Sequence, residues 1–161
     1  ARSLSGVFDL YSSIKSFDEL EYFTSVTSLP DRLFEGCQNL RSVKLHSNIS
    51  SCGQYCFAGC ISLAEIKLPQ NLNSIGTGSF LGCSSLTSIT IPASVCELSD
   101  HCFSGCSSLS SIVISEGLQS IGNYSLSGCV QLADLDLPDS ITSIGNYSFN
   151  SCTSLESIDF S

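Results

Sequence analysis

A 23-residue repeat constrains the fold of this chain more than any other feature of its sequence. The segment Leu63–Cys83 returns at Leu86–Cys106 and again at Leu109–Cys129, with no insertion or deletion between the copies. A module of this length cannot bury its own apolar face, so the copies must stack on one another to build a continuous core. The repeat therefore predicts a solenoid.

Equivalent positions of the repeat form columns, which we call lanes. Several lanes hold only aliphatic residues, and two others are nearly pure: the cysteine lane holds Cys37, Cys60, Cys83, Cys106, Cys129 and Cys152, and the phenylalanine lane holds Phe34, Phe57, Phe80, Phe103, Leu126 and Phe149. After each cysteine the pattern Leu-x-x-Ile-x-Leu alternates as a strand does, with Ile and Leu inward. We expect a parallel sheet on the concave face, with roughly 4.8 Å between coils, and short helical or 3-10 turns on the convex face.

Prolines and glycines mark the bends of each predicted coil. Pro69, Pro92 and Pro138 follow the strand and end it, because proline cannot donate to a strand ladder. One lane is mostly glycine, and we expect a tight turn with positive φ at its members, which are Gly53, Gly76, Gly122 and Gly145.

Residues 1–28 follow the repeat only loosely, and we interpret them as a degenerate N-terminal coil or cap. At a spacing of 23, five residues would lie under apolar residues of the next coil: Tyr11 under Phe34, Ile14 under Cys37, Phe17 under Leu40, Leu20 under Val43 and Tyr22 under Leu45. We place the solenoid itself at residues 29–161. It stops just after Phe160 in a core lane with no polar cap, which predicts truncation at the C-terminus.

The repeat Leu-x-x-Ile-x-Leu-Pro-x-x-Leu-x-x-Ile-Gly-x-x-Ser-Phe-x-Gly-Cys resembles the BspA-like, or Treponema pallidum-type, leucine-rich repeat. The resemblance covers about residues 29–161. It implies a horseshoe or gently curved solenoid and a surface protein of oral bacteria, spirochaetes or parasitic or commensal protists. It also implies adhesion or protein binding without catalysis, and it carries no fixed set of ligand residues.

Charge and hydropathy restrict the partners. The net charge of -9 argues against nucleic acid and anionic membranes, which need a basic surface. No stretch approaches 18 consecutive apolar residues, so we expect no membrane insertion by this segment.

Ten cysteines leave alternatives open. The 23-residue spacing of the cysteine lane is not a zinc spacing, and stacked side chains point in parallel, so buried free thiols are our main interpretation. Disulfide or redox pairs within Cys56–Cys60 and Cys102–Cys106 are alternatives. Cys96 lies outside the apolar lanes, as an exposed thiol or the partner of Cys102.

Three sequons, at Asn48, Asn123 and Asn146, predict N-glycosylation if the source is eukaryotic. The alternative is that Asn simply follows a turn glycine while Ser is the consensus of its lane. Neither the three aspartates Asp134, Asp136 and Asp159 nor the histidines form a metal or catalytic constellation, since a calcium-loop order and a neighbouring nucleophile are lacking. We expect no enzyme activity, no cofactor and no metal.

The outward residues of the concave sheet are the candidate partner-binding site. Lysines lie toward its N-terminal side and aspartates gather at its C-terminal end, where they would attract a basic partner. The candidates are Ser42, Lys44, Glu65, Lys67, Ser88, Thr90, Ser111, Val113, Asp134, Asp136 and Asp159. The alternative is a merely solvated face kept soluble by Ser and Thr.

Together these observations predict a non-enzymatic, extracellular or cell-surface module for protein binding or adhesion. Its partner would be a host or matrix protein, or other copies of itself. The alternative is a structural subunit that stacks end to end into a fibre or surface coat, as the missing cap suggests.

Overall fold

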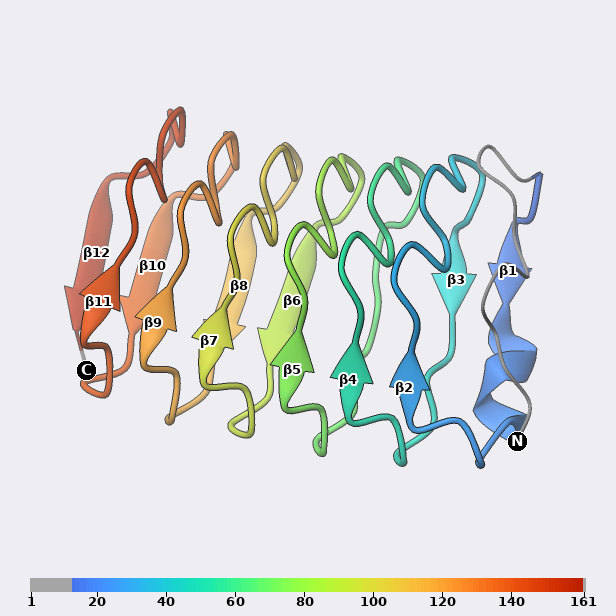
Figure 1. The fold of residues 1–161 in the computed structure, drawn as a ribbon. Helices are drawn as coiled ribbons and strands as arrows, with labels where there is room; N and C mark the ends of the chain where they lie inside the picture. The colour runs from blue at the N-terminus through green and yellow to red at the C-terminus, as the bar shows by residue number, and fades with distance from the viewer. Residues whose placement is uncertain (1–12, 161) are drawn as a thin grey trace.

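The computed structural model describes residues 13–160, which wind into successive coils of a solenoid (Figure 1). One long side is formed by parallel strands that we call the sheet face. Its strands are β1 (Ser16–Phe17), β3 (Ser42–Val43), β6 (Ser88–Ile91), β8 (Ser111–Ile114), β10 (Asp134–Leu137) and β12 (Ser157–Phe160). Residues 65–68 lie in the coil between β3 and β6 without forming a regular strand.

The pairing of these strands confirms the 23-residue register. Strand β6 pairs with β8 so that Thr90 lies opposite Val113, and β10 pairs with β12 so that Asp136 lies opposite Asp159. Both pairs are parallel, as expected when identical modules are stacked in one direction.

A second ladder of short parallel strands lies on the opposite side of the core, and the sequence pattern did not reveal it. It comprises β2 (Ser28–Leu29), β4 (Ser51–Cys52), β5 (Ser74–Ile75), β7 (Glu97–Leu98), β9 (Ser120–Ile121) and β11 (Ser143–Ile144). Each strand has two residues, too few to show an alternation that could be recognised. In the first five strands the second residue is buried and closes the core from this side.

The phenylalanine lane forms a column through the interior. Phe34, Phe57, Phe80 and Phe103 are fully buried, and their neighbouring ring centroids are 5.2, 5.3 and 5.2 Å apart with nearly parallel planes. Ring stacking at the coil spacing adds roughly 1 kcal/mol per pair to the burial of the rings. The predicted column is confirmed.

The turns of the convex side alternate between two kinds of hydrogen bond. The N–H groups of Ala58 and Cys60 donate within the coil to Tyr55 O and Phe57 O, both at 3.1 Å, as in 3-10 turns. The N–H groups of Tyr55 and Phe57 donate instead to carbonyls of the next coil, at 2.8 and 2.7 Å. Because every second donor is used between coils, these 3-10 turns do not extend into a helix.

The predicted register of the N-terminal coil is wrong. Phe17 pairs with Val43, a spacing of 26, and the N–H of Arg41 donates to Lys15 O at 2.8 Å with the same spacing. The 3-10 helix η1 (Asp18–Tyr22) follows β1, and the 23-residue spacing returns where Leu29 pairs with Cys52.

The register shift places the other N-terminal residues differently as well. Ile14 and Leu20 do not take the positions predicted under Cys37 and Val43, and Tyr22 is 76% exposed instead of extending the lane of Leu45. Tyr11 lies outside the described residues.

The role assigned to the glycine lane also needs correction. Gly53, Gly76, Gly122 and Gly145 do not have positive φ. A Cβ added at Gly53 would lie 2.5 Å from Asp31 N, and one at Gly76 would lie 2.7 Å from Gln54 N. At these glycines the backbones of successive coils approach too closely for a side chain, whereas Ser99 occupies the same lane and its hydroxyl donates to Ile75 O at 2.8 Å.

Positive φ occurs instead in two other lanes and at Gly117. One is the glycine that precedes the lane cysteine, as at Gly82 with φ 70. The other contains Tyr55, His101, Tyr124 and Tyr147, with φ between 53 and 56. In this second lane His101 stacks on Tyr124 and Tyr124 on Tyr147, both with ring centroids 5.1 Å apart, which helps to offset the backbone cost.

Candidate functional site

The alternation of each strand places the eleven candidate residues on one surface. In β6, Ile89 and Ile91 are buried while Ser88 and Thr90 are exposed, and β10 repeats this with Asp134 and Asp136 outward. Of the eleven candidates, ten are exposed and Ser42 is half-buried. The sequence therefore identified the outward residues of the sheet face correctly; their role in binding stays a prediction.

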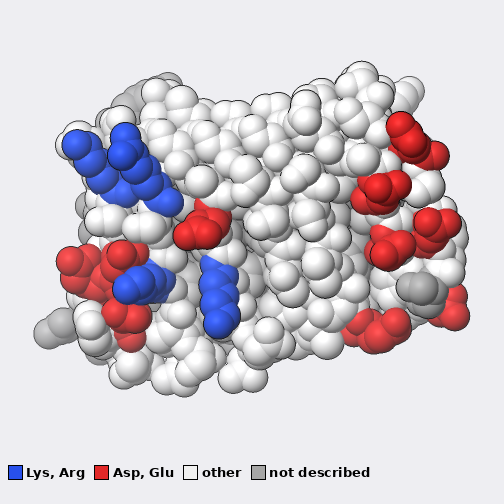
Figure 2. All heavy atoms as spheres, turned by 180° about the vertical axis from the view of Figure 1, so that it is seen from behind, with Lys and Arg blue, Asp and Glu red and all other residues white. Residues whose placement is uncertain are grey.

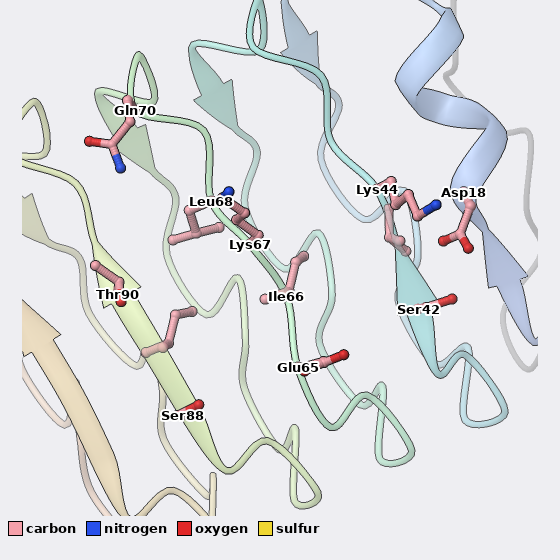
Figure 3. Close-up of a pocket in the computed structure, with 12 residues that line it drawn as sticks. Asp18, Ser42, Lys44, Glu65, Ile66, Lys67, Leu68, Gln70, Ser88 and Thr90 are labelled. Atoms are coloured by element: carbon pink, nitrogen blue, oxygen red, sulfur yellow. The ribbon is translucent and has the colours of Figure 1, made fainter.

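An open groove of about 580 Å³ lies on the N-terminal half of this face (Figure 3). Six candidates line it: Ser42, Lys44, Glu65, Lys67, Ser88 and Thr90. The remaining five candidates lie outside the groove, toward the C-terminal end of the face. The buried side chains of Ile66 and Leu68 contribute to its floor.

Two groove residues were missed by the sequence analysis. Asp18 belongs to η1, and Gln70 comes directly after Pro69. Asp18 was missed because the three extra residues of the N-terminal coil shift it out of the 23-residue register. One of its carboxylate oxygens, Oδ1, is buried without a hydrogen-bond partner.

Charge is segregated along the sheet face. Figure 2 shows Lys and Arg gathered toward the N-terminal end, together with some acids, and only Asp and Glu at the C-terminal end. The sequence has the same asymmetry, because no Lys or Arg follows Lys67. Within residues 13–160 the one salt bridge joins Arg32 to Glu35 at 2.7 Å, away from this face. The lysines and aspartates of the face are therefore not engaged in ion pairs in the described part of the chain.

The buried cysteines offer no reactive site. The nine cysteines from Cys52 to Cys152 are free thiols, and those of the cysteine lane from Cys60 on donate to carbonyls of the preceding coil, as Cys83 does to Phe57 O with Sγ and O 3.2 Å apart. Burial raises the pKa of Cys106 to about 12 and raises that of Cys102 well above its ordinary value. A buried thiol that stays protonated is not a nucleophile.

The alternative bridge between Cys96 and Cys102 does not form. Cys96 is exposed, as the sequence suggested, whereas Cys102 is fully buried, and both are free. Burial raises the pKa of Cys56, and the neighbouring thiol of Cys52, which is also buried, raises it further.

Residues 13–160 contain no group of three or more His, Cys, Asp or Glu arranged to hold a metal ion. The two histidines make different contacts. The Nδ1 of His46 accepts a hydrogen bond from the N–H of Asn48 at 3.2 Å, whereas His101 belongs to the stacked aromatic lane.

No helix within residues 13–160 is long and apolar enough to span a bilayer.

The three sequons differ in how strongly the fold already uses them. Asn123 donates to Asp100 Oδ1 at 3.2 Å, and its own Oδ1 accepts from the N–H of Asn146 at 2.8 Å. The side chain of Asn48 donates to Thr24 O at 3.0 Å. Asn146 is exposed and lies one coil after Asn123 in the same lane, so a glycan there would disturb the fewest contacts; glycosylation of any of the three stays a prediction.

Comparisons with known proteins agree with this geometry. A family model described as "BspA type Leucine rich repeat region" matches in six copies, over residues 8–103 and 80–161. None of the curated protein sequences matches the chain significantly.

Solved structures with a similar fold come from several bacteria. A leucine rich cell surface protein from Faecalibacterium prausnitzii is 26% identical with a TM-score of 0.62 and covers 84% of this chain and 43% of its own. The T. pallidum leucine rich repeat protein is 33% identical with a TM-score of 0.55, covering 83% and 51%. A leucine-rich repeat protein from Bacteroides ovatus is 29% identical with a TM-score of 0.61, covering 84% and 41%. This chain thus spans about half or less of the length of these proteins.

Proposed function

We propose that this chain, which belongs to the BspA-type leucine-rich repeat family, is a non-enzymatic binding or adhesion module of a cell-surface or secreted protein. The sheet face contacts a protein partner, either a host or matrix protein or another copy of the chain. The family and the likeness to a protein described as a cell surface protein support the location.

The observation that carries the proposal is the unpaired, segregated charge of the sheet face. Exposed charges that form no ion pair contribute little to the stability of the chain that bears them, but they steer and orient a partner. The groove beside Lys44 and Lys67 adds a concave contact region, whose walls combine two cations with the carboxylates of Asp18 and Glu65. Two regions of different charge on one face favour an extended protein surface over a small ligand.

The test is a binding assay with a fourfold variant. Glu65→Gln, Lys67→Gln, Asp134→Asn and Asp136→Asn together remove charge at both ends of the face, and all four side chains are exposed. We expect this variant to lose binding to an array of purified matrix and host-surface proteins while its thermal unfolding stays unchanged. Glu97→Gln with Glu116→Gln is the control, because both residues are exposed outside the candidate lanes. If the fourfold variant binds as well as the unaltered chain, the sheet face is not the binding surface.

The second candidate function is a structural subunit that stacks end to end. It is favoured by the parallel stacking of like coils in one direction, as where β10 pairs with β12. Head-to-tail contacts are open-ended, so light scattering should then show a mass that keeps growing with concentration. A mass that reaches a plateau would contradict this second function.

A further inference from the structure

The charged lanes of the sheet face are antisymmetric along the solenoid. One outward lane reads Lys44, Lys67, Thr90, Val113, Asp136 and Asp159, with two cations first and two anions last. The lane at the edge of the face reads Arg41, Ala64, Thr87, Ser110, Ala133 and Glu156, with a cation first and an anion last. Turned end for end, each of these lanes presents the charges that the original lane would attract.

We propose that the sheet face binds a second copy of this chain, face to face and antiparallel. The inference rests on the proposed binding role of the face and names its partner. A two-fold axis parallel to the strands, between the third and fourth residues of each six-residue lane, that is between Thr90 and Val113, reverses the order of the coils and keeps each lane opposite itself. Lys44 then meets Asp159, Lys67 meets Asp136, and Arg41 meets Glu156.

The same symmetry pairs the remaining outward lane with itself. That lane reads Ser42, Glu65, Ser88, Ser111, Asp134 and Ser157, so it adds one unfavourable pairing, of Glu65 with Asp134. With both halves counted, each dimer has six attractive pairings against two repulsive ones. In a parallel arrangement of the two solenoids each coil would meet its own copy, so the C-terminal coils, which carry only acidic charges, would repel one another.

The centre of the face suits close approach. Around the proposed axis the outward side chains are small and uncharged, with Thr90 facing Val113, which is 54% exposed, and Ser88 facing Ser111. Facing sheets pack about 10 Å apart, a gap that an extended lysine and an aspartate span together. The charged pairings thus lie at both ends and the apolar contact lies in the middle.

The chain itself is the partner that matches this pattern in spacing as well as in sign. Each charge must meet its opposite at intervals of one or more coils, roughly 4.8 Å each, and a second copy has the same interval by construction. The six coils and four-residue strands give a footprint of about 24 by 13 Å, smaller than the ~800 Å² per partner of a typical stable interface. We therefore expect a weak dimer, which should be detectable when the chain concentration reaches about 1 mM.

Charge-swap complementation tests the dimer. In variant one, Lys44→Asp and Lys67→Asp make both ends of the main lane acidic; in variant two, Asp136→Lys and Asp159→Lys make both ends basic. By sedimentation equilibrium we expect the unaltered chain to dimerise and each variant alone to associate about tenfold or more weakly. The equimolar mixture should recover a heterodimer, because acidic ends of one variant face basic ends of the other.

A matched mixture removes net charge as an explanation. Salt dependence would not decide the question, since each chain carries a net charge of -9 and salt screens this repulsion together with the local attraction. Glu97→Lys with Glu116→Lys changes the net charge as variant two does but lies outside the charged lanes. Mixed with variant one, it should not restore a dimer.

The inference is overturned if the unaltered chain stays monomeric at about 1 mM, or if both mixtures associate equally. Growth of the mass beyond a dimer would also overturn it and would favour end-to-end stacking. The chain could instead stay monomeric and still bind a matrix or host protein through the four residues changed in the fourfold variant. That result would refute the dimer alone and leave the proposed function standing.

Discussion

Two glycines of the same coil, Gly76 and Gly82, allow the physics of coil stacking to be tested directly. Gly76 lies where successive backbones nearly touch: an added Cβ would be 2.7 Å from Gln54 N and 2.8 Å from Gly53 C. Gly82 has φ 70, but an added Cβ would meet nothing within 4 Å. Alanine is therefore opposed by a backbone clash at Gly76 and only by local conformation at Gly82.

The expected magnitudes differ. Gly76→Ala pushes a methyl group against backbone atoms that cannot move aside without separating two coils, so we expect a loss of about 3 kcal/mol, toward the upper end for overpacked sites. Gly82→Ala should cost about 1 kcal/mol, the penalty of a left-handed conformation for an L-residue. Ser151, in the lane of Gly82, already adopts φ 60, which shows that this lane accepts a side chain.

Guanidinium unfolding followed by far-UV circular dichroism measures both losses, provided that a single transition with an unchanged m-value is seen. Asparagine is the discriminating control: Gly82→Asn should recover part of the loss because Asn tolerates the left-handed region, whereas Gly76→Asn should be worse than Gly76→Ala. The reasoning is refuted if Gly76→Ala is no more destabilising than Gly82→Ala.

Two further predictions concern the interior. Phe80→Ala removes a fully buried ring stacked between Phe57 and Phe103 and should cost about 3–5 kcal/mol, measured by the same unfolding assay, whereas Thr90→Ala on the exposed side should cost under about 0.5 kcal/mol. Stability should also fall as the pH rises above about 8.5, because burial raises the pKa of Cys106 to about 12 and the unfolded chain then releases the thiol proton while the folded chain keeps it. Unfolding midpoints at pH 7 and pH 10 measure this loss, which should be smaller in Cys106→Ala; an equal loss in both would contradict the role of this thiol.

The outward residues of the sheet face were predictable because strand alternation is a local property. Once Ile89 and Ile91 were assigned inward, Ser88 and Thr90 had to point outward, and the repeat extended that assignment to every coil. The groove was not predictable, because one of its walls is Asp18, whose place depends on three extra residues in a coil with little similarity to the others.

The two misread features share one cause. The register of Phe17 and the need for Gly53 and Gly76 both depend on how closely a backbone segment approaches the coil before it. Sequence patterns report which side chains are apolar and how they recur, but they contain no distance between segments of neighbouring coils. A glycine lane therefore looks the same whether it serves a left-handed turn or a close approach.

By itself the sequence determined that this chain is a stack of 23-residue coils, which residues fill its interior and which form its outward lanes, because each of these follows from a side-chain period repeated in register. The tertiary structure alone decided the second strand ladder, the reason for each glycine lane, the N-terminal register and the groove on the sheet face. Those features depend on contacts between backbones that are 22 to 26 residues apart, and such contacts exist only after the coils have stacked.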